Sequence, residues 1–586
     1  MKLIFKYMDK KEKGLAVVVF LLTFMQVFLD CSIPAQTKKI STLLQTEGTS
    51  INVVYSSGLV MLALALGAFT CAVLISYLIA SVGTGIGTKI RFAIMNRIME
   101  YSLPEMGEFG VGSLITRSTD DVTTIQTFIN GCMKPLVQAP LMTILVISRI
   151  SGIYSVWTIL TIIVVAVIVA LVIYIFAVAV PAVKGQFINR DMIVRESSEH
   201  ISGIRVIHAY NAQEYQKKRF SKINIDMSDL AARSEKALAT FMPVTVSMLY
   251  ALTIGVYVSG AIHIGDVEAS QRVALYGDMT AFVFYVALLI TAILSVVQLV
   301  LMFPSTMNSM HRINEVLDKE ASIKDKEGAN DIPYAGGNIE FKDVCFKYPG
   351  SDESAIKNIS FTANKGETIA IIGDTGCGKT SVLNLILRLY DVSEGSVLVD
   401  GKDVREYKLR DLRDRIGYVP QKSFLFEGKI RENIGYGEND RFMATIDEII
   451  KAAQIGQADE FIKGKEGGYD AEITSGGTNL SGGQRQRMAI SRAICRDPEI
   501  FIFDDSFSAL DFKTDKELRR KLKEYAKGTT MIIVGQRIST VRDADKIIVM
   551  EKGCMVGIGT HAELMDSCKV YRDIALSQMS SEEAMA

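Results

Sequence analysis

The stretch Gly373-Asp-Thr-Gly-Cys-Gly-Lys-Thr-Ser381 decides how the second half of the chain folds. It follows the apolar run 368–372, which predicts a buried strand, and precedes the run 381–389, which has helical length and composition. Glycines between a strand and a helix let successive N–H groups turn toward a phosphate chain, and the helix N-terminus adds positive charge. The loop therefore predicts binding of ATP and Mg²⁺. Lys379 would contact the β- and γ-phosphates and Thr380 the Mg²⁺, and the predicted ATP-binding residues are Gly373, Asp374, Thr375, Gly376, Cys377, Gly378, Lys379, Thr380 and Ser381.

Composition limits what surrounds this loop. The chain has 586 residues, too many for one hydrophobic core, and 49% of them are hydrophobic. The mean hydropathy of +0.24 predicts that part of the chain lies in a lipid bilayer. A net charge of −1 argues against nucleic acid as a partner. The eight cysteines form no CxxC pair and predict neither a zinc site nor a disulfide framework.

Six segments are long and apolar enough to cross a bilayer, which takes about 20 residues. They lie at 14–34, within 51–82, at 127–147, at 154–182, within 237–263 and at 279–304. Asp30 and Lys134 fall inside the first and third segments. Because charge inside a membrane is costly, both are candidates for a substrate path, with snorkelling toward the headgroups as the alternative.

Basic residues gather in two of the connecting loops, between the second and third segments and between the fourth and fifth. The positive-inside rule then places both loops and both termini in the cytoplasm of a multi-pass plasma-membrane protein. The loops are long, polar and helical in pattern, so the membrane helices should extend into the cytoplasm.

The predicted domains follow the changes in composition. Residues 1–317 form a transmembrane domain, 318–337 a polar linker, 338–577 an α/β nucleotide-binding domain and 578–586 a small acidic tail.

A second motif, Leu480-Ser-Gly-Gly-Gln-Arg-Gln-Arg487, identifies the family. With the loop at 373–381 upstream and the apolar run Phe501-Ile-Phe-Asp504 downstream, it resembles the signature of ATP-binding cassette (ABC) transporters. Six membrane segments followed by one nucleotide domain resemble a half-transporter of the exporter class, of the bacterial multidrug type. The resemblance implies a membrane domain of six transmembrane helices with long cytoplasmic extensions, followed by an α/β P-loop domain.

The resemblance also implies roles for single residues. Tyr348 would stack on adenine, Gln421 would touch Mg²⁺ and the attacking water, and Asp504 would join the Mg²⁺ shell. In this family two nucleotide domains meet head to tail, so a second half-transporter is an expected partner. The residues expected to bind the partner's ATP are Ser481, Gly482, Gly483 and Gln484. The stretches 111–121 and 203–216 resemble coupling helices that dock on a nucleotide domain; solvated amphipathic helices are the alternative.

Two departures from the family pattern fall at the hydrolytic centre. Asp505 stands where the family has the glutamate that polarises water, and Gln536 stands where it has the switch histidine. A displacement of about 1 Å in a catalytic group can cost on the order of 100-fold in rate. Glutamine cannot become cationic. The pattern resembles the degenerate-site subunit of a heterodimeric exporter, with neutral drift in a working site as the alternative.

The function expected from these features is ATP-driven export of an amphipathic or lipophilic compound, either a small molecule or a lipid. Two alternatives stay open. One is an ATP-gated channel or sensor that does not pump, and the other is an importer built on the exporter fold.

Overall fold

The structure is a computed structural model that describes residues 2–46, 50–151, 153–266, 268–326, 336–437 and 444–578. The chain divides into two compact units. The membrane unit comprises Met1–Met99 and Val111–Lys319, and the nucleotide unit comprises Glu100–Gly110 and Glu320–Ala586. Residues 327–335 of the predicted linker and residues 579–586 of the predicted tail lie outside the described residues.

Among the described residues, six long helical stretches of the membrane unit are apolar enough to cross a membrane, as the predicted fold class requires. They comprise α2 (Lys10–Gln45), α3 (Ile51–Glu100), α5 (Val111–Ser118) with α6 (Asp120–Ile150), α7 (Ser155–Ser202), α9 (Gln213–Ala239) with α10 (Phe241–Asp266), and α11 (Ala269–Asp318). Short helices α1 (Lys2–Lys6) and α8 (Ile204–Ala209) complete the unit. The long helices run past the predicted apolar segments because each helix satisfies its own backbone hydrogen bonds, whatever its side chains.

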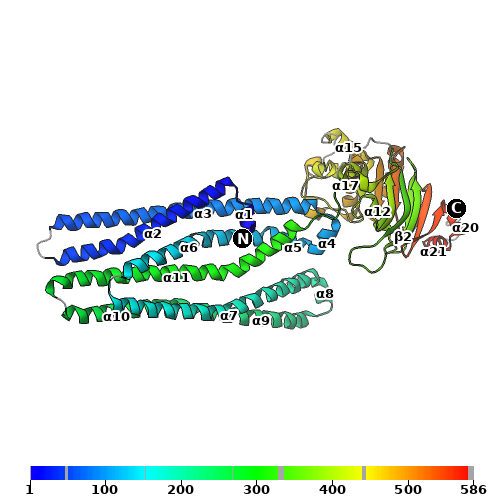
Figure 1. Ribbon diagram of the computed structural model, residues 1–586. Coiled ribbons are helices and arrows are strands. Elements are labelled where there is room, and N and C mark those ends of the chain that lie inside the picture. Colours follow the sequence, from blue (N-terminus) through cyan, green and yellow to red (C-terminus); the bar gives the residue numbers. More distant parts are fainter. Residues whose placement is uncertain are drawn as a thin grey trace. The chain divides into compact units, whose positions relative to one another are not determined.

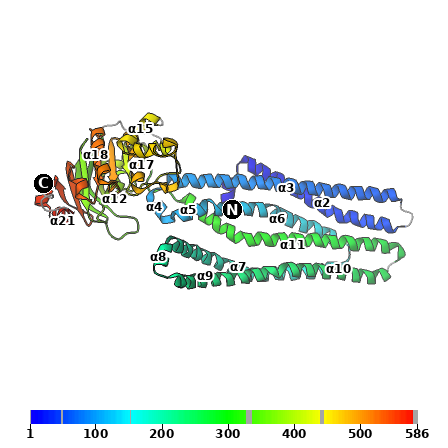
Figure 2. The ribbon, with the colours of Figure 1, turned by 180° about the vertical axis from the view of Figure 1, so that it is seen from behind.

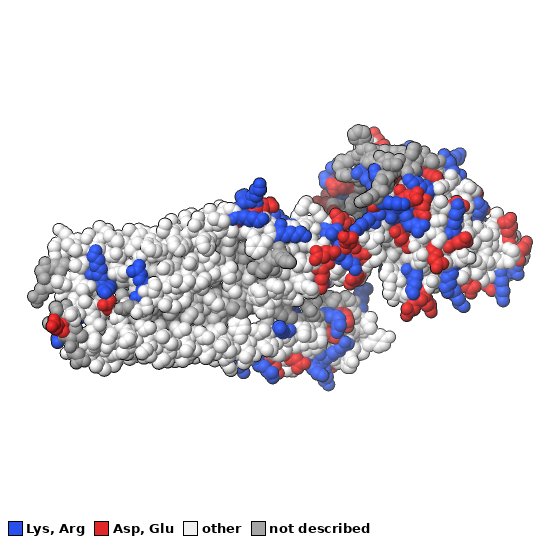
Figure 3. Space-filling view, viewed as in Figure 1, with Lys and Arg blue, Asp and Glu red and all other residues white. Residues whose placement is uncertain are grey.

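The long helices of the membrane unit form two groups that meet where α10 packs against α11. Helices α2 and α6 both pack against α11, whereas α7 packs along α9 and α10 (Figures 1 and 2). The single tryptophan of the chain, Trp157 on α7, is fully buried. Its indole N–H donates to the Ser259 hydroxyl at 2.9 Å, and its ring lies 5.4 Å from that of Phe282 on α11. Figure 3 shows few charged side chains over most of the visible face of these helices.

The described residues of the nucleotide unit form three sheets. The central sheet has the strand order β12-β11-β3-β10-β9-β6, with all but β12 parallel, and the second sheet has the order β2-β1-β4-β5. Strands β7 and β8 form a short pair. The strands are β1 (Ile339–Phe346), β2 (Ile356–Ala363), β3 (Thr368–Gly373), β4 (Glu394–Val399), β5 (Lys402–Asp403), β6 (Ile416–Val419), β7 (Gly428–Lys429), β8 (Glu472–Ile473), β9 (Ile500–Asp504), β10 (Thr530–Val534), β11 (Lys546–Glu551) and β12 (Cys554–Gly559).

In the described part of the nucleotide unit there are eleven α-helices, one of them from the 100–110 segment. They are α4 (Leu103–Phe109), α12 (Lys379–Ile386), α13 (Leu409–Asp414), α14 (Ile430–Ile434), α15 (Ile446–Ile455), α16 (Asp459–Lys463), α17 (Gly482–Cys495), α18 (Phe512–Tyr525), α19 (Ile538–Val541), α20 (His561–Ser567) and α21 (Lys569–Gln578).

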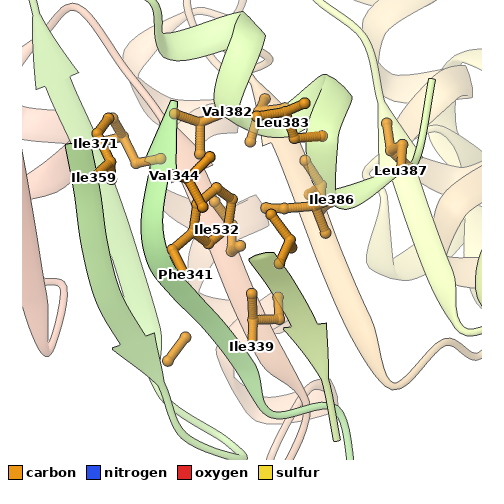
Figure 4. Close-up of a cluster of buried hydrophobic side chains, with 14 of the residues drawn as sticks. Ile339, Phe341, Val344, Ile359, Ile371, Val382, Leu383, Ile386, Leu387 and Ile532 are labelled. Atoms are coloured by element: carbon orange, nitrogen blue, oxygen red, sulfur yellow. The ribbon is translucent and has the colours of Figure 1, made fainter. Parts of the chain in front are cut away.

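The main core of this unit lies between the two larger sheets and includes one face of α12 (Figure 4). Phe341 comes from β1, Ile371 and Ile532 come from the central sheet, and Leu383 and Ile386 come from α12. All five are at most 2% exposed. Burial of an aliphatic side chain contributes roughly 1.5–3 kcal/mol, so this contact fixes α12, and with it the loop 373–381, against the central sheet.

Candidate nucleotide site

Four parallel strands of the central sheet end at the same edge and carry the predicted site residues. The loop 373–381 follows β3, Gln536 follows β10, Asp504 ends β9, and Gln421 follows β6. The register pairs Val534 with both Ile371 and Asp504. Residues separated by more than 100 positions thus meet at one edge of the sheet, where α/β proteins bind their ligands.

The loop 373–381 has a backbone that only glycine allows at two positions. Gly373 and Gly378 have φ of +157° and +104°, and a Cβ would lie 2.2 Å from the carbonyl oxygen of Met550 or 2.7 Å from that of Ala355. Lys379 is 8% exposed, and its ammonium donates to the carbonyls of Gly373 and Asp374, both at 2.7 Å. The lysine is thus held over the loop, where it would meet phosphate oxygens.

A side-chain pair at this edge fits the predicted Mg²⁺ position. The Thr380 hydroxyl donates to Asp504, with 3.2 Å to its Oδ2. Burial raises the pKa of the Asp504 carboxyl above its ordinary value. The hydrogen bond from Thr380 opposes this rise, and the neighbouring charge of Asp505 adds to it. A hydroxyl and one carboxylate are oxygen ligands of the kind that Mg²⁺ takes together with substrate phosphates and water. When bound, Mg²⁺ would neutralise charge on the phosphates.

Asp505 is held by two side-chain amides. Gln536 donates to its Oδ2 at 3.2 Å, and Gln421 reaches the same oxygen at 3.5 Å. The residue has a φ of +47°, a left-handed conformation that aspartate tolerates better than most residues. Burial raises the pKa of the Asp505 carboxyl, and the hydrogen bond from Gln421 and the charge of Lys379 oppose the rise. Asp505 and Gln536, the two departures from the family pattern at the hydrolytic centre, are therefore hydrogen-bonded to each other.

Tyr348, Ser481 and Cys377, which are also predicted to contact nucleotide, each contact a neighbouring polar group. The Tyr348 hydroxyl is 2.9 Å from that of Ser381, at the first turn of α12. Ser481 is the N-cap of α17, where its hydroxyl accepts from the N–H of Gln484 at 3.3 Å and its own N–H donates to the Gln484 side chain at 3.0 Å. This capping box satisfies two N–H groups at the start of α17, and the positive end of the helix favours an anion there. Cys377 is buried, with its sulfur 3.6 Å from the Lys379 ammonium.

Helix α4 is a feature that the sequence analysis missed. It belongs to the nucleotide unit, although it lies between two membrane helices in sequence. Its residue Glu105, 3% exposed, accepts from the N–H of Ser322 at 3.2 Å, and the Ser102 hydroxyl accepts from that of Ile323 at 3.3 Å. The signal in the sequence was the capping box Ser102-x-x-Glu105 with Pro104 in the first turn. The predicted stretches 111–121 and 203–216 form α5 with the start of α6, and α8 with the start of α9.

Comparisons with known proteins agree with this architecture. Residues 16–308 match the family described as the ABC transporter transmembrane region, and residues 356–508 match the ABC transporter family. The chain is a member of the ABC transporter family, built as a membrane-embedded half-transporter of the exporter type.

Two relatives and one solved structure resemble this chain over most of its length. An uncharacterized ABC transporter ATP-binding protein of Mycobacterium tuberculosis is 34% identical over 526 residues, covering 89% of each chain. The ATP-dependent lipid A-core flippase of Pseudomonas aeruginosa is 30% identical over 523 residues, covering 88% of this chain and 84% of the flippase. A bacterial Atm1-family ABC exporter with ATP bound shares the fold, with a TM-score of 0.82 over 98% of this chain and 99% of the other at 22% identity.

Proposed function

We propose that this chain is the degenerate-site half of a heterodimeric exporter that expels an amphipathic or lipophilic substrate across the plasma membrane. The observation that carries the proposal is the hydrogen bond from Gln536 to Asp505, which pairs the positions of the family's switch histidine and water-polarising glutamate. The loop 373–381 keeps the groups that hold ATP and Mg²⁺. The site formed on this loop therefore binds ATP and hydrolyses it slowly.

The second half-transporter supplies the fast site in this proposal. Its phosphate-binding loop faces the signature residues Ser481, Gly482 and Gly483 of this chain, which begin α17 with an intact N-terminal cap. The stretches 111–121 and 203–216 act as coupling helices, and the basic loops and both termini lie in the cytoplasm. Kinship with a lipid A-core flippase favours an amphipathic substrate.

The test compares two substitutions in the complex of the two half-transporters. Replacing the glutamate of the partner by glutamine should abolish most ATPase activity, because the general base of the fast site is lost. Asp505→Asn should leave most of the activity, since the slow site contributes little to turnover. Rapid, substrate-stimulated ATPase in a homodimer of this chain, stopped by Asp505→Asn, would show that aspartate is a working base.

A transport assay separates the exporter from its alternatives. Inside-out vesicles that contain the complex should accumulate a lipophilic dye only when ATP is supplied. ATP-dependent ion conductance without dye accumulation would instead support a gated channel, and dye accumulation in right-side-out vesicles would support an importer.

A further inference from the structure

Helix α2 has two chemically different sides. Its exposed side is apolar and bears Val17, Phe20, Leu21, Phe24 and Phe28. The opposite side bears Thr23, Gln26 and Asp30, which recur every three or four residues and so share one face of the helix. Thr23 is 0% and Gln26 is 8% exposed, and Asp30 is half-buried. The polar side of α2 therefore faces protein, not lipid.

Lys134 on α6 lies close to this polar side. Helices α2 and α6 run in the same direction (Figure 1). The sulfurs of Cys31 on α2 and Met142 on α6 are 3.4 Å apart, so these two residues lie at the same level along the helices. Lys134, eight residues before Met142, therefore lies about 12 Å back along the axis, near the level of Thr23. Gln26 falls between the levels of Lys134 and Asp30.

The two opposite charges are within electrostatic reach of each other without being paired. Each contributes to the electrostatic environment of the other, yet among the described residues no ion pair within 4.0 Å joins them. Gln26 donates to Asp30 at 3.4 Å, while its own side-chain oxygen is buried without a partner in the described part of the chain. By contrast, Lys38 on α2 makes a direct ion pair with Asp278 on α11.

We infer that Gln26, Asp30 and Lys134 form a binding site for the head of a zwitterionic amphiphile with a primary ammonium group and an anionic group. The Asp30 carboxylate and the Gln26 oxygen accept from the ammonium, and Lys134 donates to the anion. Unpaired charge within a membrane span is costly and marks substrate pathways, and a zwitterion compensates both charges at once. The inference rests on the proposed transport function and names its substrate class.

Binding to the full chain in phosphatidylglycerol nanodiscs tests the site. The zwitterionic probes are lysophosphatidylethanolamine with a pyrene-labelled acyl chain, and 2-aminotetradecanoic acid as its competitor. Dodecylamine and lysophosphatidylglycerol present the positive and the negative charge alone. Competition by the amino acid shows that a carboxylate serves as well as a phosphate, and failure to compete restricts the site to phospholipid-type heads.

Each charge-removing variant should change selectivity in its own direction. Asp30→Asn should weaken zwitterion binding about tenfold, the loss of one charge-assisted hydrogen bond, and dodecylamine binding with it, but spare lysophosphatidylglycerol. Lys134→Met should weaken the zwitterion equally and spare dodecylamine. The matched controls Lys38→Met and Asp278→Asn remove charges that are already paired and should leave every probe unchanged.

If either single variant fails to fold, the charge-swapped variant Asp30→Lys with Lys134→Asp takes its place. It retains one charge of each sign and should still bind the zwitterion. Equal loss of all probes in the single variants, or a folded charge swap that does not bind, would show that the charges are only structural and overturn the inference. Probe binding without ATP-driven dye accumulation would refute export and leave the site standing. Dye accumulation with unchanged probe selectivity would refute the site alone.

Discussion

The two halves of the nucleotide site differ in what builds them. The phosphate-binding half is one continuous loop whose donors are backbone groups and whose ammonium is held by two carbonyls of the same loop. The half proposed to activate water consists of side chains from separate strands, Asp505 after β9 and Gln536 after β10, joined by one hydrogen bond. A single substitution removes a side chain but leaves the loop backbone intact. Binding can therefore persist where hydrolysis has been lost.

The largest effect is expected on the binding half. Lys379→Ala removes the cation over the phosphates and should weaken ATP binding at this site on the order of 100-fold, as the loss of a strong charge-assisted contact. Photolabelling with 8-azido-ATP, scored on this chain separately from its partner, gives the measurement. Lys527→Ala changes an exposed lysine before β10, at the opposite edge of the sheet, and should have no effect. Unchanged labelling of Lys379→Ala would contradict the assignment of the loop.

A gain of ATP hydrolysis would show that Asp505 and Gln536 limit the rate at this chain's own site. With the partner's glutamate replaced by glutamine, Asp505→Glu combined with Gln536→His should raise the residual ATPase by about 100-fold, within the range that a positioned general base contributes. The longer carboxylate reaches the water, and histidine can become cationic where glutamine cannot. Initial phosphate release is the readout, and Asp505→Glu alone should recover less. Equal activity of the double variant and the unmodified chain would place the defect outside these two residues.

The smallest effect concerns the signature end of the site. Ser481→Ala removes the N-cap of α17 and should lower the free energy of unfolding by about 1 kcal/mol, measured by thermal denaturation. In the proposed head-to-tail assembly this chain's signature faces the partner's loop, so the substitution should also slow ATP hydrolysis there. Thr560→Ala removes the similar cap of α20, where Thr560 and Glu563 form the same capping box, and serves as the control. Both variants should lose similar stability; if both also lose similar ATPase, the effect of Ser481 is only structural.

The sequence was most informative where spacing alone defines the chemistry. The loop 373–381 and the run ending at Asp504 could be predicted because each is local, and so could six apolar helices followed by an α/β unit. The bond between Asp505 and Gln536 could not, because it depends on β9 and β10 lying side by side in register. The sequence marked both residues as departures from the family pattern at the hydrolytic centre but did not predict the hydrogen bond between them.

In the membrane unit, too, the sequence did not predict which residues from different helices come close together. Asp30 and Lys134 were separate candidates in the sequence, and only the packing of α2 beside α6 brings them into electrostatic reach. Hydropathy alone marks only the apolar part of each helix, but the helical pattern of the polar loops predicted that the helices continue past it, and the structure confirms this. The capping box of α4 is local and was present in the sequence, but the attachment of α4 to the nucleotide unit could not be predicted, because its partners Ser322 and Ile323 lie more than 200 positions further along the chain.

Trp157 is an intrinsic fluorescent probe of the membrane unit. Because it is the only indole in the protein and lies in the membrane unit, tryptophan emission excited at its red edge comes from one point between α7, α10 and α11. The nucleotide unit is dark at that wavelength. A shift in emission when ATP is added to this chain would therefore report a change that has travelled out of the nucleotide unit, and its time course could be followed without a label.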